Sequence, residues 1–250
     1  MKKVLALDFD GVIWDSAGEC FQVGWRAYQE LTGRDLSADI YKEGFLHGRP
    51  LARTGHDFYL LLLLMEQEPS RDLRELSLKD FAQYRSSHAT EATEFDRVFY
   101  RLRAHYRDTE PKQWVSWQKP YYQVLQLLDD WDEEFSGLAL ATTKDTASAT
   151  NLLALTGRNW PGFGKEFSEH KADQIFGISQ HFKVPPEDIL FIDDLVENLI
   201  QVEPTKARVA LAAWGYNLPQ SRKQAKKDGR EIVTLDSLAR LFQDFLGQSA

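Results

Sequence analysis

Two aspartates separated by one residue follow a short apolar run near the start of the chain, in the sequence VLALDFDGV. Asp8 and Asp10 come where a buried strand is expected to end, and Gly11 follows directly. Carboxylates gathered at a buried position repel one another unless a cation or a proton lies between them. A turn ending in Asp-Gly accounts for Asp10 and Gly11, but not for Asp8. The two aspartates therefore indicate a site at which a reaction takes place.

Further polar groups follow the later apolar runs, or begin the segment after one. They are Thr142 and Thr143, then Lys171, and then Asp193 and Asp194. Each has a simpler explanation, because threonine and aspartate commonly cap helices and a single lysine is commonly exposed. Their order along the chain, each at a strand end or a helix start, favours a common site.

These residue types predict phosphoryl transfer with a divalent cation. The carboxylates of Asp8, Asp193 and Asp194 are expected to surround Mg²⁺, which takes oxygen ligands and commonly binds carboxylates together with a phosphate. A carboxylate beside Mg²⁺ and a lysine can attack phosphorus and form an aspartyl-phosphate. The Asp10 carboxylate is then free to carry a proton to the leaving oxygen and from the attacking water.

Other groups are expected to hold the phosphoryl oxygens. The Thr142 hydroxyl can donate a hydrogen bond, and free backbone N–H groups around Phe9 and Gly11 can do the same. Glycine at position 11 lets the backbone approach a ligand closely.

The elements that position these groups are short buried strands alternating with helices. The strands are expected at Lys3–Leu7, Gly137–Ala141, Asp188–Ile192 and Arg208–Ala212. Helical periodicity marks Tyr121–Trp131, Ala147–Leu155, Lys171–Phe182, Asp194–Val202 and Leu235–Leu246. This alternation predicts an α/β fold, a Rossmann-like parallel sheet with helices on both faces. Ligands of such sheets bind beyond the carboxyl ends of the strands, where the polar residues stand.

The interval 16–119 has a different character, rich in helix formers, aromatic residues and charges, with no convincing buried strand. We expect a helical domain over 16–119, inserted into an α/β domain made of 1–15 and 120–250. The longest apolar run, FYLLLLLM at 58–65, is far shorter than the roughly 20 residues of a membrane span and predicts a buried helix.

Composition narrows the classes of partner. The chain has 250 residues, 43% hydrophobic and 27% charged, as expected for a globular protein. Its net charge of -8 argues against a nucleic-acid partner, even for the basic stretch at 221–230. The single cysteine, Cys20, excludes an internal disulfide and a cysteine-based zinc site. We expect a cytoplasmic protein without a membrane partner; the oligomeric state is not predicted.

The motifs resemble those of the haloacid dehalogenase-like superfamily, in its phosphatase branch with a helical cap, as in phosphoglycolate phosphatases. Four segments carry the resemblance: LALDFDGV with Asp8 and Asp10, LALATTKD with Thr142, SEHKADQI with Lys171, and ILFIDDLVEN with Asp193, Asp194 and Asn198. The later segment VALAAWGYN is similar to the strand and loop that often follow. The first and fourth motifs are specific, whereas the second and third are weak by themselves.

The resemblance implies a Mg²⁺-dependent phosphatase for a small soluble phosphorylated metabolite. Asp8 would be the nucleophile and Asp10 the general acid and base. The Asp8 carboxylate, the Asp10 backbone carbonyl and Asp194 would hold Mg²⁺, with Asp193 as a further ligand, directly or through water. Thr142 and Lys171 would bind the phosphoryl group. The insertion at 16–119 would be a cap that closes over the substrate.

Two features depart from the family pattern or lie outside it. Thr143 stands where relatives often have asparagine, which leaves only its backbone N–H as a phosphate donor. In the cap segment, Arg49 and Arg53 are candidates for substrate selection, because arginine suits carboxylate and phosphate groups. The alternative is that both form salt bridges on the surface of the cap.

Other activities of the same family remain open. Asp10 argues against a dehalogenase, which does not need a second aspartate. A phosphotransferase or mutase of the β-phosphoglucomutase type would use the same core residues and return the phosphoryl group to its product. A non-catalytic member that binds a phosphorylated metabolite is the third possibility, although Asp8, Asp10, Lys171 and Asp194 are all present.

Overall fold

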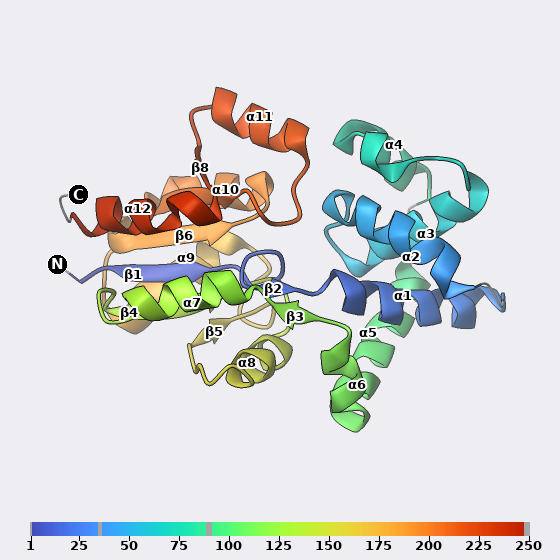
Figure 1. The fold of residues 1–250 in the computed structure, drawn as a ribbon, viewed down its shortest axis with the longest axis horizontal. Helices are drawn as coiled ribbons and strands as arrows, with labels where there is room; N and C mark the ends of the chain where they lie inside the picture. The colour runs from blue at the N-terminus through green and yellow to red at the C-terminus, as the bar shows by residue number, and fades with distance from the viewer. Residues whose placement is uncertain (1, 35–36, 89–91, 248–250) are drawn as a thin grey trace. The chain divides into compact units, whose positions relative to one another are not determined.

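The computed structural model describes residues 2–34, 37–88 and 92–247 (Figure 1). The chain divides into two compact units, one formed by residues 1–15 and 120–250 and the other by residues 16–119. We call them the sheet unit and the helical unit and describe each by itself.

Parallel strands form the sheet of the sheet unit. They are β1 (Val4–Leu7), β4 (Gly137–Ala141), β5 (Gly162–Phe163), β6 (Ile189–Asp193), β7 (Arg208–Ala212) and β8 (Glu231–Val233). Their order is β5-β4-β1-β6-β7-β8, and every pairing is parallel. The four expected strands are present. The sequence patterns do not indicate β5 and β8, because both are short, partly exposed edge strands without a buried apolar run.

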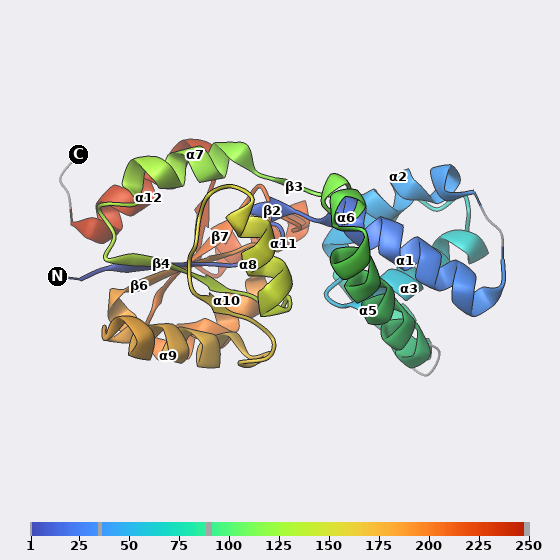
Figure 2. The same cartoon turned by 90° about the horizontal axis from the view of Figure 1, so that it is seen from below.

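Helices cover both faces of this sheet, which confirms the expected α/β fold. They are α7 (Tyr122–Trp131), α8 (Thr146–Ala154), α9 (Lys171–Phe182), α10 (Val196–Val202), α11 (Pro219–Lys227) and α12 (Leu235–Leu246), with short 3-10 turns η3 (Pro186–Asp188) and η4 (Glu203–Thr205). Figure 2 shows the sheet nearly edge-on, with α7 and α12 on one face and α9 and α10 on the other.

The alternation of side chains along each strand fills both layers. On the α9 and α10 side, Ala6 of β1 and Phe191 of β6 lie in one buried cluster with Ile175 and Leu199 from the two helices. Successive residues of a strand face opposite sides of the sheet. All four residues of β1 are buried, so both faces of this strand are covered. A strand buried on both faces positions its carboxyl end firmly.

The helical unit contains α1 (Ala17–Thr32), α2 (Ala38–Gly48), η1 (Arg49–Leu51), α3 (Gly55–Gln67), η2 (Leu73–Glu75), α4 (Leu78–Ser87), α5 (Ala92–Thr109) and α6 (Pro111–Ser116). The two-residue strands β2 (Trp14–Asp15) and β3 (Lys119–Pro120) pair with one another where the chain leaves and re-enters the sheet unit. The apolar run at 58–65 lies in α3 and is almost entirely buried, as expected. Among the described helices, none is long and apolar enough to cross a membrane.

A buried ion pair joins α1 and α5 inside the helical unit. Arg103 donates two hydrogen bonds of 2.7 Å to the two carboxylate oxygens of Glu19, whose side chain is fully buried. The Trp114 indole N–H donates to the same carboxylate at 3.2 Å. Because a buried carboxylate needs such partners, Glu19 has a structural role in this unit.

Candidate active site

The register of the central strands brings two predicted aspartates together. Leu7 of β1 lies beside Ile192 of β6, so the next residues, Asp8 and Asp193, are neighbours at the carboxyl ends of these strands. The Asp8 backbone N–H donates to the Ile192 carbonyl at 2.9 Å, which extends the pairing by one residue. From β1 the chain adds β4 and β5 on one side of the sheet and then β6, β7 and β8 on the other, and such a switch point is where parallel sheets bind ligands.

Asp8, Asp193 and Asp194 form a buried acidic cluster. One carboxylate oxygen of each lies within 4.8 Å of the others. The exposed fractions of these residues are 7%, 0% and 1%. Three carboxylates this close and this dry require positive charge among them.

Lys171 supplies one positive charge to this cluster. Its ammonium group donates to Asp8 Oδ1 at 2.7 Å and to the Ala141 carbonyl at 2.5 Å, and it lies 3.1 Å from Asp193 Oδ2. Burial lowers the pKa of Lys171, but the attraction of Asp8 and Asp193 outweighs burial and leaves this pKa raised. Lys171 therefore carries its charge in the fully buried site.

The charged form of Asp8 is stabilised less than the charged form of Lys171. Burial raises the pKa of Asp8 from 3.8 to about 7, with Lys171 opposing and Asp193 adding to the shift. One ammonium group therefore does not compensate fully for the desolvation of this carboxylate and for its acidic neighbours.

Asp193 and Asp194 are oriented by different partners. Asp193 Oδ1 accepts from the Leu195 N–H at 2.8 Å, and the Asn198 amide donates to both Asp193 oxygens at 3.0 Å. The Tyr216 backbone N–H donates to Asp194 Oδ2 at 2.5 Å. Asp193 thus accepts from the backbone just before α10, but the N-cap of this helix is Leu195, so helix capping does not explain Asp193 and Asp194.

A tight turn follows Asp8 and fixes Asp10. Gly11 has φ +87°, and a Cβ there would come 2.1 Å from Asp194 Oδ2, so only glycine fits. The Phe9 carbonyl accepts from three following N–H groups in this turn. The Gly11 N–H, which we expected to be free, donates to the Trp14 carbonyl at 2.8 Å because the turn closes there.

The two threonines after β4 differ in environment. Thr142 is buried, and its hydroxyl oxygen accepts from the Lys144 N–H at 3.1 Å. Thr143 is exposed. Neither caps α8, because Asp145 is the N-cap and accepts from the Ser148 N–H at 2.9 Å. Helix capping therefore does not explain why Thr142 stands at the end of β4.

Lys144 and Gln174 also belong to the site, although the sequence motifs did not identify them. The Lys144 ammonium group lies 3.2 and 3.3 Å from the two carboxylate oxygens of Asp10. The fully buried Gln174 amide donates to the Thr142 carbonyl at 2.8 Å and to the Ser168 carbonyl at 2.7 Å. Lys144 was visible as a polar residue after β4, but the sequence does not indicate the direction of its side chain.

The loop after β7 is a second feature of the site that the motifs identified only by similarity. The Asn217 amide donates to the Asp194 carbonyl at 3.1 Å and to the Ala212 carbonyl at 2.8 Å. A Cβ at Gly215 would come 2.3 Å from the Asp194 Cβ. The sequence WGYN therefore supports Asp194 through backbone and amide groups.

Arg49 and Arg53 lie together in the helical unit, at and just after η1. Arg49 is buried, donates to the Ala52 carbonyl at 3.1 Å and lies 5.4 Å from the centre of the Phe58 ring. Arg53 donates to the Pro50 carbonyl at 2.8 Å. The burial of Arg49 differs from the exposed salt bridge considered as the alternative.

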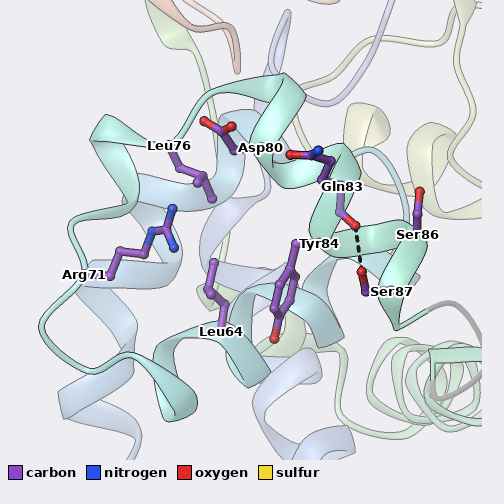
Figure 3. A pocket seen from close by; sticks show the side chains of 8 residues that line it. All are labelled: Leu64, Arg71, Leu76, Asp80, Gln83, Tyr84, Ser86 and Ser87. Carbon is purple, nitrogen blue, oxygen red and sulfur yellow. Dashed lines mark hydrogen bonds between the residues drawn. The ribbon is translucent and has the colours of Figure 1, made fainter.

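A separate cavity of about 620 Å³ lies on the helical unit (Figure 3). Its lining comprises Leu64, Arg71, Leu76, Asp80, Gln83, Tyr84, Ser86 and Ser87. None of these is a predicted site residue, and most of the polar ones are exposed. The acidic cluster of the sheet unit therefore remains the candidate active site.

The chemistry of the acidic cluster fits a divalent cation. Its donors are carboxylate oxygens, which Mg²⁺ prefers. The positive charge present, that of Lys171, leaves the pKa of Asp8 raised to about 7, so the cluster has capacity for further positive charge. Asp8, Asp193 and Asp194 are thus suitable to hold such an ion.

Comparison with known proteins identifies the fold. No protein-family model and no curated protein matches the sequence. The structure is similar to a haloacid dehalogenase-like hydrolase from Streptococcus pneumoniae, with a TM-score of 0.63 and 19% identity over 96% of this chain and 98% of that one. It is also similar to a candidate phosphoglycolate phosphatase from Lactobacillus delbrueckii, with a TM-score of 0.68 and 16% identity over 99% and 100%.

A candidate phosphoglycolate phosphatase from Haemophilus somnus gives a TM-score of 0.65 at 16% identity, over 97% of this chain and 98% of that one. The chain therefore has the haloacid dehalogenase-like fold, as the motifs predicted.

Proposed function

We propose that the protein is a Mg²⁺-dependent phosphomonoester hydrolase that works through an aspartyl-phosphate on Asp8. The observation that carries the proposal is the position of the Asp8 carboxylate. It lies at the carboxyl end of the central strand β1, accepts a hydrogen bond from Lys171 and lies within 4.8 Å of Asp193 and Asp194. This arrangement provides a nucleophile, a fixed cation and carboxylate ligands at one point.

In the first half of the reaction, an oxygen of Asp8 bonds to phosphorus while the bond from phosphorus to the leaving oxygen breaks. Asp10 gives a proton to that leaving oxygen. In the second half, water attacks the aspartyl-phosphate, the bond to Asp8 breaks, and Asp10 takes a proton from the water. Phosphate and the dephosphorylated alcohol leave, and both aspartates return to their starting forms.

The charge of the transferred group is balanced by residues of the sheet unit. Lys171 and the Thr142 hydroxyl bind phosphoryl oxygens, and the backbone N–H groups of Phe9, Gly11 and Thr143 are further donors, with Gly11 first giving up its bond to Trp14. Mg²⁺ bound by Asp8, the Asp10 carbonyl, Asp193 and Asp194 would stabilise negative charge on the phosphoryl group.

The helical unit takes the role of a cap that selects the substrate. Arg49 and Arg53 together provide guanidinium groups suited to a second anionic group, such as a carboxylate. Two neighbours in the structural comparison are named as candidate phosphoglycolate phosphatases, which supports a small phosphorylated metabolite as the substrate.

The test is phosphate release from a panel of phosphorylated metabolites, with Mg²⁺ or with a chelator, and with Asp8→Asn as the blank. We expect release with Mg²⁺ from at least one compound and loss of more than about 100-fold with chelator, because the ion supplies several kcal/mol of charge stabilisation. Equal release with and without chelator would contradict the metal requirement. Transfer of phosphate between sugar positions without release would identify a mutase.

The raised pKa of Asp8 predicts that the metal-free protein loses stability as the pH rises. Between 3.8 and about 7, folded Asp8 holds a proton that the unfolded chain has released. The free energy of unfolding then falls with pH by at most about 1.4 kcal/mol per unit from this group, and levels off above pH 7.

Urea unfolding in chelator at a series of pH values measures this effect, and Asp8→Asn is the control that lacks the ionisable group. We expect wild type to lose stability relative to Asp8→Asn between pH 4.5 and 7. A difference between the two proteins that stays constant over this range would contradict the prediction.

A further inference from the structure

An ion pair between Lys144 and Asp10 lies beside the acidic cluster, and the mechanism above gives Lys144 no role. The Lys144 side chain is fully buried, whereas that of Asp10 is 22% exposed. The ammonium group lies nearly equally far from both Asp10 oxygens, at 3.2 and 3.3 Å. It therefore holds the whole carboxylate group and does not favour one oxygen.

The backbone of Lys144 is fixed by hydrogen bonds on both sides. Its N–H donates to the Thr142 hydroxyl oxygen at 3.1 Å, and its carbonyl accepts from the Lys165 N–H at 3.2 Å. Gly164 approaches so closely that a Cβ there would come 2.8 Å from the Lys144 carbonyl oxygen. The direction of the lysine side chain is thus set by the segment that also carries Thr142.

The ammonium end is fixed as well. It lies 5.9 Å from the centre of the Phe9 ring, within the range of a cation–π contact. A buried lysine costs free energy unless a carboxylate compensates it, and Asp10 provides that carboxylate. Asp10 itself stands on a short turn with a partly exposed side chain, which without a partner would sample several rotamers.

We propose that Lys144 is a positioning residue that orients the Asp10 carboxyl group, whose protonated form transfers a proton to the leaving oxygen. The proposal rests on the proposed function, in which Asp10 is the general acid. In this role Lys144 acts through Asp10, whose carboxylate oxygens its ammonium group contacts.

This role predicts a dependence on the leaving group. An alkyl phosphate releases a strongly basic alkoxide and needs the proton from Asp10, whereas 4-nitrophenyl phosphate releases a stable phenolate and needs it little. The parameter to compare is kcat/KM, because it reports the steps up to the transfer of phosphorus to Asp8.

The experiment measures kcat/KM for wild type and Lys144→Met with 4-nitrophenyl phosphate and with the alkyl phosphate of the panel that wild type hydrolyses fastest. We expect Lys144→Met to lose about 10- to 100-fold on the alkyl phosphate, since a small misplacement of a catalytic group costs about that much. The loss on 4-nitrophenyl phosphate is expected to stay below about 3-fold, because general acid catalysis contributes little there.

Lys3→Met is the matched control, since Lys3 makes a 2.7 Å ion pair with Asp188 in the same unit and lies before β1, at the end opposite to Asp8. It is expected to leave the ratio of the two substrates unchanged. Lys144→Arg, which keeps the charge, is expected to restore part of the ratio. Equal losses of Lys144→Met on both substrates, or a raised KM with unchanged kcat, would overturn the proposal, the latter identifying a substrate-binding lysine.

The double variant Asp10→Asn/Lys144→Met removes both charges and tests the proposal even where Lys144→Met alone does not fold. With 4-nitrophenyl phosphate, we expect its kcat/KM to match that of Asp10→Asn, because Lys144 acts through Asp10. A further loss in the double variant of about 10-fold or more would overturn the proposal. Wild type that releases no phosphate from any substrate would refute the proposed function itself, whereas active wild type with unselective variants would refute only the role of Lys144.

Discussion

Asp8→Asn is expected to lower phosphate release by about 10⁴-fold or more, because asparagine cannot form the bond to phosphorus that the mechanism requires. The fold is expected to survive. Burial raises the pKa of Asp8 to about 7, so the neutral carboxyl group is favoured in the metal-free site below that pH, and asparagine has nearly the same shape.

Phosphate release at saturating substrate, together with a thermal unfolding curve, checks both parts of this prediction. Asp188→Asn is the matched control, since Asp188 is a partly exposed aspartate of the same unit that pairs with Lys3. Near-normal release by Asp8→Asn, in a preparation free of wild type, would contradict the assignment of Asp8 as the nucleophile.

Lys171→Met is expected to lower the free energy of unfolding by about 3–5 kcal/mol, the usual cost of removing one partner from a buried ion pair. The Lys171 ammonium group contacts Asp8 and Asp193, and its side chain is fully buried, so no water replaces the lost charge. Turnover is expected to fall by at least about 10²-fold, because a cation that faces the transferred group is lost.

Urea unfolding in chelator measures the loss of stability, and Lys3→Met again provides the comparison. Its ion pair with Asp188 has side chains 19% and 20% exposed, and its removal is expected to cost about 1 kcal/mol or less. A cost for Lys171→Met as small as for Lys3→Met would show that the acidic cluster does not depend on this lysine.

Addition of Mg²⁺ is expected to stabilise Lys171→Met as well as wild type, because a ligand that binds only the folded state shifts the equilibrium toward it. The absence of stabilisation in both proteins would argue against Asp8, Asp193 and Asp194 as the ligands of the ion.

The sequence by itself determined the main strands and the ends at which the polar residues stand. A strand buried on both faces has a continuous apolar sequence, so VLAL and ILFI were recognisable as strands without knowledge of the neighbouring strands. The same local signals placed Asp8, Thr142 and Asp193 after strands, and parallel strands bring such ends to one edge. The edge strands β5 and β8 were missed, because they are too short and too exposed to have this signature.

Only the tertiary structure decided which side chains meet at that edge. The strand order and the register of β1 with β6 place Asp8 next to Asp193. No local sequence pattern specifies the strand order or the register. The pairing of Lys144 with Asp10, across 134 positions of sequence, depends on the direction of a long flexible side chain. The turn at Gly11 likewise uses the Gly11 N–H, which donates to the Trp14 carbonyl and which we expected from the sequence to be free. Local periodicity determines elements because it depends on near neighbours, whereas contacts between distant residues depend on packing of the whole sheet unit.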